Sequence, residues 1–173
     1  MPASLGLEKI AEAGDASDYM TATNAAAGVM MTMLADGGTP PGGMKTTLVK
    51  TSIKESDLAM LHVSVLAMLG NTNDGFTGTP SLAIGQLAIG ESISMHALSY
   101  DAGTEKNTES KMTVPGPAAG GEAFNAMRDD TTNHVTMHPG IVSMDDGLAT
   151  SALTHLQRWD NPTARITIKR LAP

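Results

Sequence analysis

Two acidic loops carry the side chains in this sequence that are best suited to chemistry. The first is NTNDGF at 71–76, which contains Asp74, and the second is YDAGTE at 100–105, which contains Asp101 and Glu105. Calcium binds six to eight oxygen atoms from carboxylates, backbone carbonyls and waters, and a tight loop can direct several of these at one point. Asp, Asn and Gly are also the residues that turns prefer. On spacing alone, ordinary turns explain the two loops better than a metal site does.

The histidines form a second set of candidate ligands. His134 and His138 are four residues apart, a spacing that suits a zinc pair on a helix, but Val135 stands where a metalloprotease motif has its Glu. In a strand, residues four apart lie about 13 Å from each other, so that one ion cannot bind both. Each would need a histidine on a neighbouring strand, such as His62 or His96. We interpret them as structural or surface histidines, and copper or zinc binding through His and Met stays as an alternative function.

The 13 methionines are many for a chain of 173 residues. Thioether sulfur suits copper(I), but flexible methionines also fill cores that are poor in aromatic residues. We predict core positions for Met30, Met33, Met60, Met68, Met95 and Met137.

Local signatures of catalysis are missing from the sequence. It contains no nucleophile elbow, phosphate loop or dinucleotide fingerprint, and the glycine-rich stretch at 115–121 lacks the lysine of a phosphate loop. With no cysteine, thiolate chemistry and disulfides are excluded. The sequence therefore predicts a binding module and not an enzyme.

Composition narrows the class of partner. The 18 acidic and 11 basic residues give a net charge of −7, which disfavours nucleic acid and anionic membrane surfaces. No stretch approaches the roughly 20 apolar residues of a membrane span. The length suits a single domain over 1–173.

The elements that must position these loops follow from the hydrophobic periodicity. Alternation with period two predicts antiparallel strands at 60–69, 92–100, 132–138 and 163–171. Helical spacing predicts helices at 4–13, 16–28 and 148–158, with Ser4 as the first N-cap and Asp15 or Ser17 as the second. Turn-rich stretches at 36–43, 71–80, 101–110 and 114–121 separate these elements. Strands that do not alternate regularly with helices predict an all-β antiparallel sandwich.

Several segments together resemble the bacterial branch of the spondin N-terminal domain family. They are PASLGLEKIAEAGD at 2–15, NTNDGFTG at 71–78, SYDAGTEKNTE at 99–109, HPGI at 138–141 and RWDNPTARITIKRL at 158–171. The resemblance implies a calcium-binding β-sandwich like that of F-spondin and mindin, which are extracellular matrix proteins. It implies that Asp74, Asp101 and Glu105 are the ligands of Ca2+, with Glu at 105 where the animal loop has Asp.

The resemblance also sets expectations for role and assembly. It implies a secreted or cell-surface protein that acts in adhesion through an unknown protein or surface glycan partner, although we find no signal peptide in the sequence as given. In the family an opening strand precedes the segment that begins here at residue 2. We therefore expect an unpaired strand edge, and we expect that the chain either dimerises through this edge or was trimmed from a longer precursor.

Overall fold

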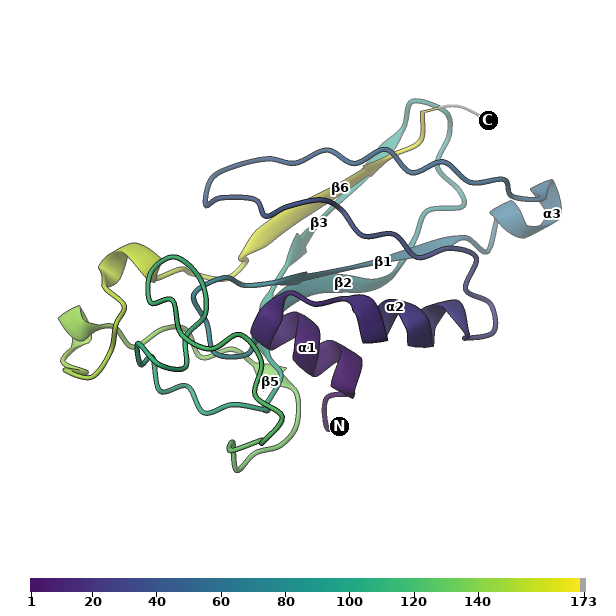
Figure 1. The fold of residues 1–173 in the computed structure, drawn as a ribbon. Helices are drawn as coiled ribbons and strands as arrows, with labels where there is room; N and C mark the ends of the chain where they lie inside the picture. The colour runs from purple at the N-terminus through teal and green to yellow at the C-terminus, as the bar shows by residue number, and fades with distance from the viewer. Residues whose placement is uncertain (172–173) are drawn as a thin grey trace.

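The computed structural model describes residues 1–171 and consists mainly of strands, with a few short helices (Figure 1). The α-helices are α1 (Leu5–Ala13), α2 (Ser17–Asn24) and α3 (Glu55–Leu58). The strands are β1 (His62–Met68), β2 (Gly75–Ala83), β3 (Ser92–Ala97), β4 (Ser99–Asp101), β5 (Thr136–Met137) and β6 (Ala164–Lys169). Two 3-10 turns, η1 (Met144–Asp146) and η2 (His155–Gln157), precede the last strand.

The strands form two antiparallel sheets, which confirms the all-β class. One sheet has the order β1-β2-β4-β5 and the other pairs β3 with β6. The two-stranded sheet lies against β2, and helix α1 packs across β1 and β2. The two sheets do not close around a common core. None of the helices in residues 1–171 has the length and apolar character needed to cross a membrane.

The strand predicted at 92–100 is in fact two strands in different sheets. Residues up to Ala97 pair with β6, and residues from Ser99 pair with β2. Between β3 and β4, side chains form the hydrogen bonds that the backbone groups do not make within a sheet. Thr77 Oγ1 donates to the Leu98 carbonyl, and Asn161 Oδ1 accepts from the Ser99 N–H. The alternation of apolar and polar residues continues where the chain changes sheets, so the sequence pattern alone predicts a single strand.

The largest error in the sequence-based prediction concerns strand β2. The stretch 71–80 reads as a turn, yet from Gly75 onward it is a central strand of the four-stranded sheet. A Cβ at Gly78 would collide with the carbonyl oxygen of Val65 on β1. The glycine therefore permits close approach of two strands instead of forming a turn.

The other strand predictions vary in accuracy. Strands β1 and β6 confirm the segments 60–69 and 163–171 to within two residues at each end. Of the predicted strand at 132–138, only Thr136 and Met137 pair, with β4.

The first helix follows its prediction closely. Ser4 is its N-cap, with Oγ accepting from the Leu7 N–H at 3.2 Å, and Gly14 ends it in the left-handed conformation with φ of 70°. The second helix begins at Ser17 and ends at Asn24, four residues before the predicted end. Its N-cap is Ala16, and Asp15 Oδ1 accepts from the Ser17 N–H at 2.9 Å.

The predicted late helix at 148–158 is wrong. Only the short turn η2 lies in this range, because Ser151 instead pairs with Ser110 in an isolated bridge. Each 3-10 turn has a capping box, formed by Ser143 with Asp146 in η1 and by Thr154 with Gln157 in η2. Local side-chain bonds thus start short turns where helical spacing predicts a long helix.

The core consists of two small apolar clusters. One lies between α1 and the four-stranded sheet and contains Ala3, Ala11, Phe76 and Ala102. The other lies beneath the loops at the opposite end and contains Val114, Ile141 and Leu153, with Trp159 packed against them.

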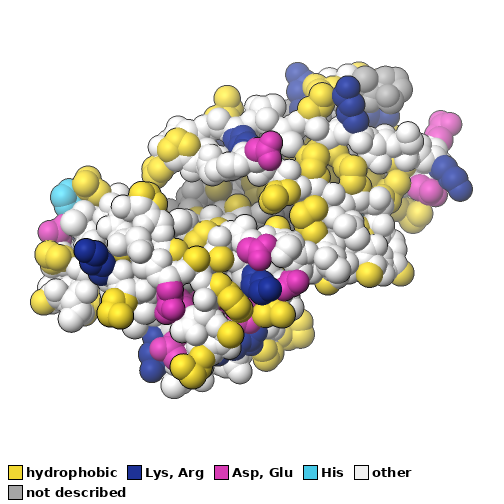
Figure 2. All heavy atoms as spheres, in the orientation of Figure 1, with side chains coloured by type: hydrophobic (Ala, Val, Ile, Leu, Met, Phe, Trp, Pro, Cys, Tyr) yellow, Lys and Arg dark blue, Asp and Glu magenta, His cyan; other side chains and the backbone are white. Residues whose placement is uncertain are grey.

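The methionines contribute less to this core than predicted. Met30, Met33, Met60, Met95 and Met137 are between 38% and 70% exposed, and only Met68 of the six is half-buried. Two of them belong to the segment 25–54, which contains neither helix nor strand and is almost entirely exposed. Hydrophobic side chains are scattered over the visible face of the molecule (Figure 2).

Candidate metal centre

Strand register brings the two predicted acidic loops together. Asp74 immediately precedes β2, and Asp101 is the last residue of β4. These strands are antiparallel neighbours, and Gly75 pairs with Asp101. The N–H of Ala102 donates to the carbonyl of Asp74 at 3.1 Å, which joins the loops where the strands end. The two loops are therefore adjacent, as the sequence predicted.

The second loop wraps around the Asp74 carboxylate. Asp74 Oδ2 accepts from the backbone N–H of Thr104 at 2.7 Å and of Glu105 at 3.1 Å. Asp101 Oδ1 accepts from the N–H of Gly103 at 2.7 Å, and its Oδ2 accepts from Asn107 Nδ2 at 2.6 Å. Both aspartates are thus held in place by donors that an ionised carboxylate requires.

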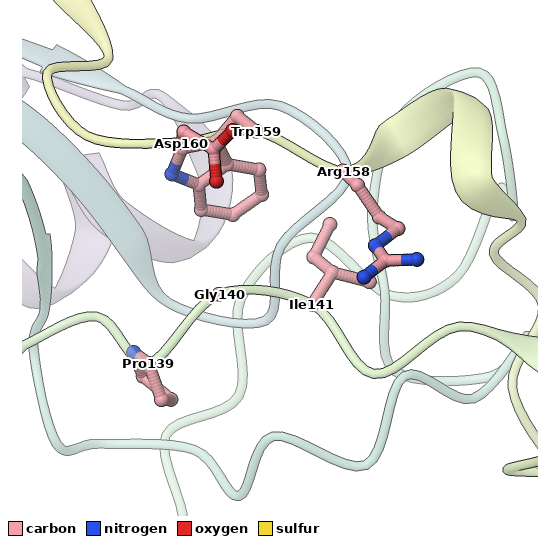
Figure 3. A pocket seen from close by; sticks show the side chains of 6 residues that line it. All are labelled: Pro139, Gly140, Ile141, Arg158, Trp159 and Asp160. Atoms are coloured by element: carbon pink, nitrogen blue, oxygen red, sulfur yellow. The ribbon is translucent and has the colours of Figure 1, made fainter. Parts of the chain in front are cut away.

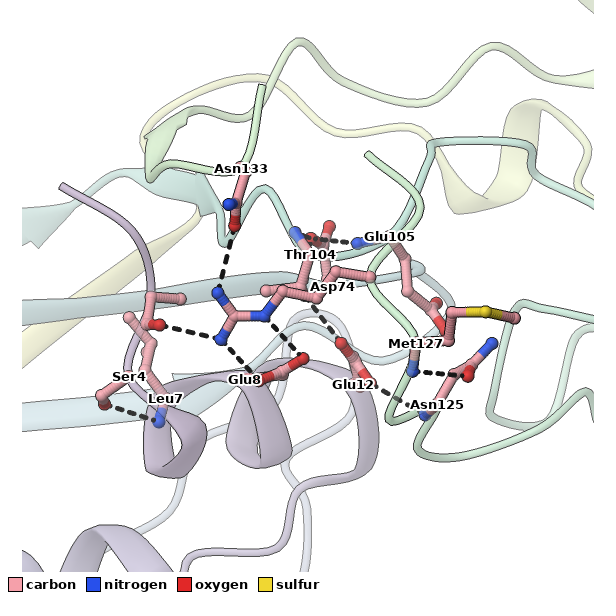
Figure 4. A network of polar contacts seen from close by, with 12 residues as sticks. Ser4, Leu7, Glu8, Glu12, Asp74, Thr104, Glu105, Asn125, Met127 and Asn133 are labelled. Atoms are coloured by element: carbon pink, nitrogen blue, oxygen red, sulfur yellow. Dashed lines mark hydrogen bonds and ion pairs between the residues drawn. The ribbon is translucent and has the colours of Figure 1, made fainter. Parts of the chain in front are cut away.

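Helix α1 adds a fourth carboxylate that the sequence analysis did not select. Glu12 Oε1 accepts from the Thr104 hydroxyl at 2.7 Å, and its Oε2 accepts from the N–H of Asn125 at 3.0 Å. The same Thr104 hydroxyl lies 3.1 Å from Asp74 Oδ2 (Figure 4). Glu8 and Glu12 are one turn apart beside the apolar stripe of α1, and that spacing was the signal available in the sequence.

Glu8 belongs to a separate ion pair in the same network. Its carboxylate accepts from Arg128 Nε at 2.9 Å and from Nη2 at 2.6 Å. Arg128 also donates to the carbonyl of Ala3 and to Asn133. The guanidinium therefore neutralises Glu8 and ties the start of the chain to the 128–133 segment.

The four carboxylates of the cluster are nearly inaccessible to solvent. Glu12, Asp74, Asp101 and Glu105 are between 0% and 5% exposed. Among residues 1–171, no lysine, arginine or histidine forms an ion pair with any of them. We refer to these four residues as the acidic cluster.

Burial and mutual repulsion shift the proton affinities of the cluster. Burial raises the pKa of Glu105 to about 8, with a further contribution from the charge of Glu12. Burial likewise raises the pKa of Glu12 to about 7, and it raises the pKa of Asp74 to about 6 with help from the charge of Asp101. Near neutral pH the cluster therefore favours binding positive charge, either as protons or as a cation.

Two buried oxygen atoms, one in the acidic cluster and one in the residue next to it in sequence, have no hydrogen-bond partner. They are Asp74 Oδ1 and Asn73 Oδ1. Asn73 is 1% exposed, and its Nδ2 lies 3.5 Å from Glu105 Oε2, which places the amide among the carboxylates. A buried acceptor without a partner costs about 1–3 kcal/mol. Both atoms are acceptors, so a cation or its bound water would satisfy them.

The side chains of the acidic cluster do not form a coordination shell. In residues 1–171 no group of three or more His, Asp or Glu side chains is arranged so that it could hold a metal ion. The structure brings the Asp74 and Asp101 loops together and bonds the Glu105 backbone to Asp74, but side-chain rotation would be needed for all carboxylates to meet at one ion. Calcium also accepts amide and backbone oxygens, as Asn73 could provide.

The histidines lie on different elements of the fold, and His138 is near enough to Asp101 to be affected by its charge. His62 is on β1 and His96 on β3, in different sheets, and His134 is exposed. His138 is 4% exposed, and its Nδ1 accepts from the Gly140 N–H at 3.0 Å. Burial lowers the pKa of His138, which keeps the ring neutral.

Trp159 lines a shallow pocket at the end of the molecule that contains the 3-10 turns. Its Nε1 donates to Ser99 Oγ at 3.2 Å, and its ring lies tilted against His138 with 5.0 Å between centroids. The pocket measures about 340 Å³ and is lined by Pro139, Gly140, Ile141, Arg158, Trp159 and Asp160 (Figure 3). The tryptophan therefore packs the 158–160 segment, and not a helix, onto the strands.

Comparison with known proteins adds no assignment. No protein-family model matches the chain, and neither a curated protein nor a solved structure matches it.

Proposed function

We propose that this chain binds calcium between its two acidic loops and acts as a binding module. The observation that carries the proposal is the acidic cluster, whose four buried carboxylates have no neutralising cation among the described residues. The unpartnered oxygens of Asp74 and Asn73 support it, because calcium is bound by oxygen ligands of these types.

The residues that would hold the ion come from both loops. Asp74 would bind through Oδ1, since its Oδ2 is occupied by backbone N–H groups. Asp101 and Glu105 would supply further carboxylate oxygens, and Asn73 would supply its amide oxygen. Calcium tolerates six to eight ligands in flexible geometry, which suits a site whose carboxylates come from a strand end and from loops.

The resemblance of the loops to the spondin N-terminal domain supports a finer proposal. In that family the fold is a β-sandwich of extracellular proteins, so we propose an open form of the sandwich and a secreted or cell-surface location. Adhesion to a protein or surface glycan partner follows from the same family analogy. Copper or zinc binding is less well supported, because His62 and His96 lie in different sheets and His134 is exposed.

Thermal unfolding with and without chelator tests the calcium proposal. A ligand that binds only the folded state stabilises it by about 2.7 kcal/mol at a hundredfold excess over Kd. We expect EDTA to lower the Tm, and we expect calcium to restore it better than magnesium, which demands tighter octahedral geometry. Asp101→Asn should reduce the calcium effect strongly, and Glu105→Gln should reduce it less.

A negative result would be clear. If EDTA leaves the Tm unchanged, and the Asp101→Asn variant binds calcium with the affinity of the parent in calorimetry, the loops are turns without a metal. Elemental analysis of the purified protein separates calcium from copper and zinc in the same samples.

A further inference from the structure

We propose that the pocket beside Trp159 binds an uncharged sugar ring and is the place where this chain contacts a surface glycan. The pocket is separate from the proposed calcium site, because no residue of the acidic cluster lines it. Sugar binding therefore does not require calcium binding, and the two can be tested apart.

The pocket lies between two segments that are distant in the sequence. The 139–141 segment forms one side, and the 158–160 segment forms the other (Figure 3). Its volume of about 340 Å³ lies near the lower end of the range for ligand pockets, about 300–1,000 Å³. A single ring of a glycan fits this volume, whereas a helix or strand of a protein partner requires a longer groove.

Trp159 gives the pocket a fixed aromatic wall. Its Nε1 donates to Ser99 Oγ at 3.2 Å, and the His138 ring packs against it with 5.0 Å between centroids. The half-buried indole also packs against the apolar cluster beneath the loops. These contacts hold the ring in place before a ligand arrives, so binding costs little ordering of the side chain. An aromatic ring offers an apolar surface to the C–H groups of a sugar.

Two side chains of opposite charge line the pocket together with the indole. Arg158 offers N–H donors, and Asp160 offers carboxylate acceptors. Arg158 Nη1 lies 3.0 Å from Asp146 Oδ1, which leaves Nε and Nη2 for a ligand. Asp160 is exposed and forms no ion pair within residues 1–171. A hydroxyl both donates and accepts, so a ring with several hydroxyls can bond to both side chains.

The balance of charge disfavours ionised ligands. An anionic ligand would be repelled by Asp160 and by Asp146, which already neutralises Arg158. A cationic amine could bind Asp160, but it would leave the donors of Arg158 unused. The lining therefore favours a neutral hexose or N-acetylhexosamine over an acidic or sulfated sugar.

The single tryptophan makes a direct test possible. Trp159 is the only tryptophan of the chain, so its fluorescence reports on this pocket alone. The probes are the methyl glycosides of glucose, galactose, mannose and N-acetylglucosamine, titrated in EDTA and in calcium, with sorbitol as an acyclic control. We expect at least one glycoside to change the emission saturably and to reduce its quenching by acrylamide, with Kd of about 1 mM or above for one ring in a shallow pocket. Sorbitol should give no saturable change.

Variants of the two charged residues locate the bound sugar. Asp160→Ala removes the acceptor, and Arg158→Gln removes the charged donors. Each should weaken binding of that glycoside by about tenfold, as expected for loss of a hydrogen bond to a charged group. Asp36→Ala is the matched control, because Asp36 is an exposed carboxylate in the 36–43 loop and does not line the pocket. This variant should keep the Kd of the parent.

The outcomes separate the sugar site from the calcium proposal. If no glycoside changes the emission in either buffer, the pocket does not bind sugar rings, and a protein becomes the better candidate for the partner. If a glycoside binds but both pocket variants keep the parental Kd, the sugar binds elsewhere, which also overturns the assignment. If a glycoside binds in EDTA to a chain that does not bind calcium, the sugar site stands and only the calcium proposal fails.

Discussion

At the scale of single residues, Asp74 has a buried carboxylate whose charge should cost stability in the metal-free chain. Its Oδ2 accepts hydrogen bonds from backbone donors, while its Oδ1 is buried without a hydrogen-bond partner. Asp74→Asn keeps an acceptor for the backbone donors and removes one negative charge. We expect this variant to melt higher than the parent in EDTA and lower than the parent in saturating calcium.

The sign reversal distinguishes a metal ligand from a packing residue. Differential scanning calorimetry of both proteins in both buffers measures it. A variant that is less stable than the parent by the same amount with and without calcium would contradict the ligand role of Asp74.

At the scale of elements, the 101–105 loop depends on Gly103. This residue has φ of 70°, and an added Cβ would collide with the backbone of His134. Strain of this kind costs about 1–3 kcal/mol, and the collision would also displace the loop that bonds to Asp74. We expect Gly103→Ala to destabilise the protein in urea by at least about 1 kcal/mol and to weaken calcium binding.

Gly120 offers a matched comparison for that substitution. It has φ of 72°, but an added Cβ would meet nothing within 4 Å. Gly120→Ala should therefore show the backbone strain alone and leave calcium affinity unchanged. Equal calcium affinities for the two variants would show that the position of the 101–105 loop does not matter to the site.

At the scale of the whole molecule, the acidic cluster should make stability depend on pH in an unusual direction. The pKa values of Asp74, Glu12 and Glu105 are raised to about 6, 7 and 8 in the folded chain. Their stabilising protons are fully bound below the ordinary carboxyl pKa, near 4 to 4.5, and are lost as pH rises through these folded values. The metal-free protein should therefore melt several degrees higher at pH 5 than at pH 8.

Calcium should remove most of this pH dependence, because it replaces the protons as the countercharge. Glu109, whose pKa burial raises to about 7, lies outside the cluster and should retain its own contribution. Melting curves at several pH values in EDTA and in calcium provide the measurement. A metal-free protein whose Tm rises between pH 5 and pH 8 would contradict the electrostatic description of the cluster.

The sequence by itself determined the local features of this protein. Period-two alternation located β1 and β6, and Ser4 marked the start of α1, because side-chain periodicity and caps are local properties. The same alternation did not reveal that the chain changes sheets at Leu98, since pairing partners come from distant residues. The late helix failed because Ser151 pairs with Ser110, which lies far away in the chain.

The residues of the candidate site also divide into those that the sequence identified and those that only the tertiary structure brought close to them. Asp74, Asp101 and Glu105 could be selected from the composition of two loops and a family resemblance. Only the tertiary structure placed Glu12 beside them, because the docking of α1 on the sheet sets that contact, whereas the helical spacing indicates only that Glu12 lies beside the apolar stripe. The tertiary structure alone also distinguished Glu8, which Arg128 neutralises, from Glu12, which Arg128 does not neutralise. Residue types specify which chemistry is available, whereas burial and the packing of distant segments decide which charges must share one site.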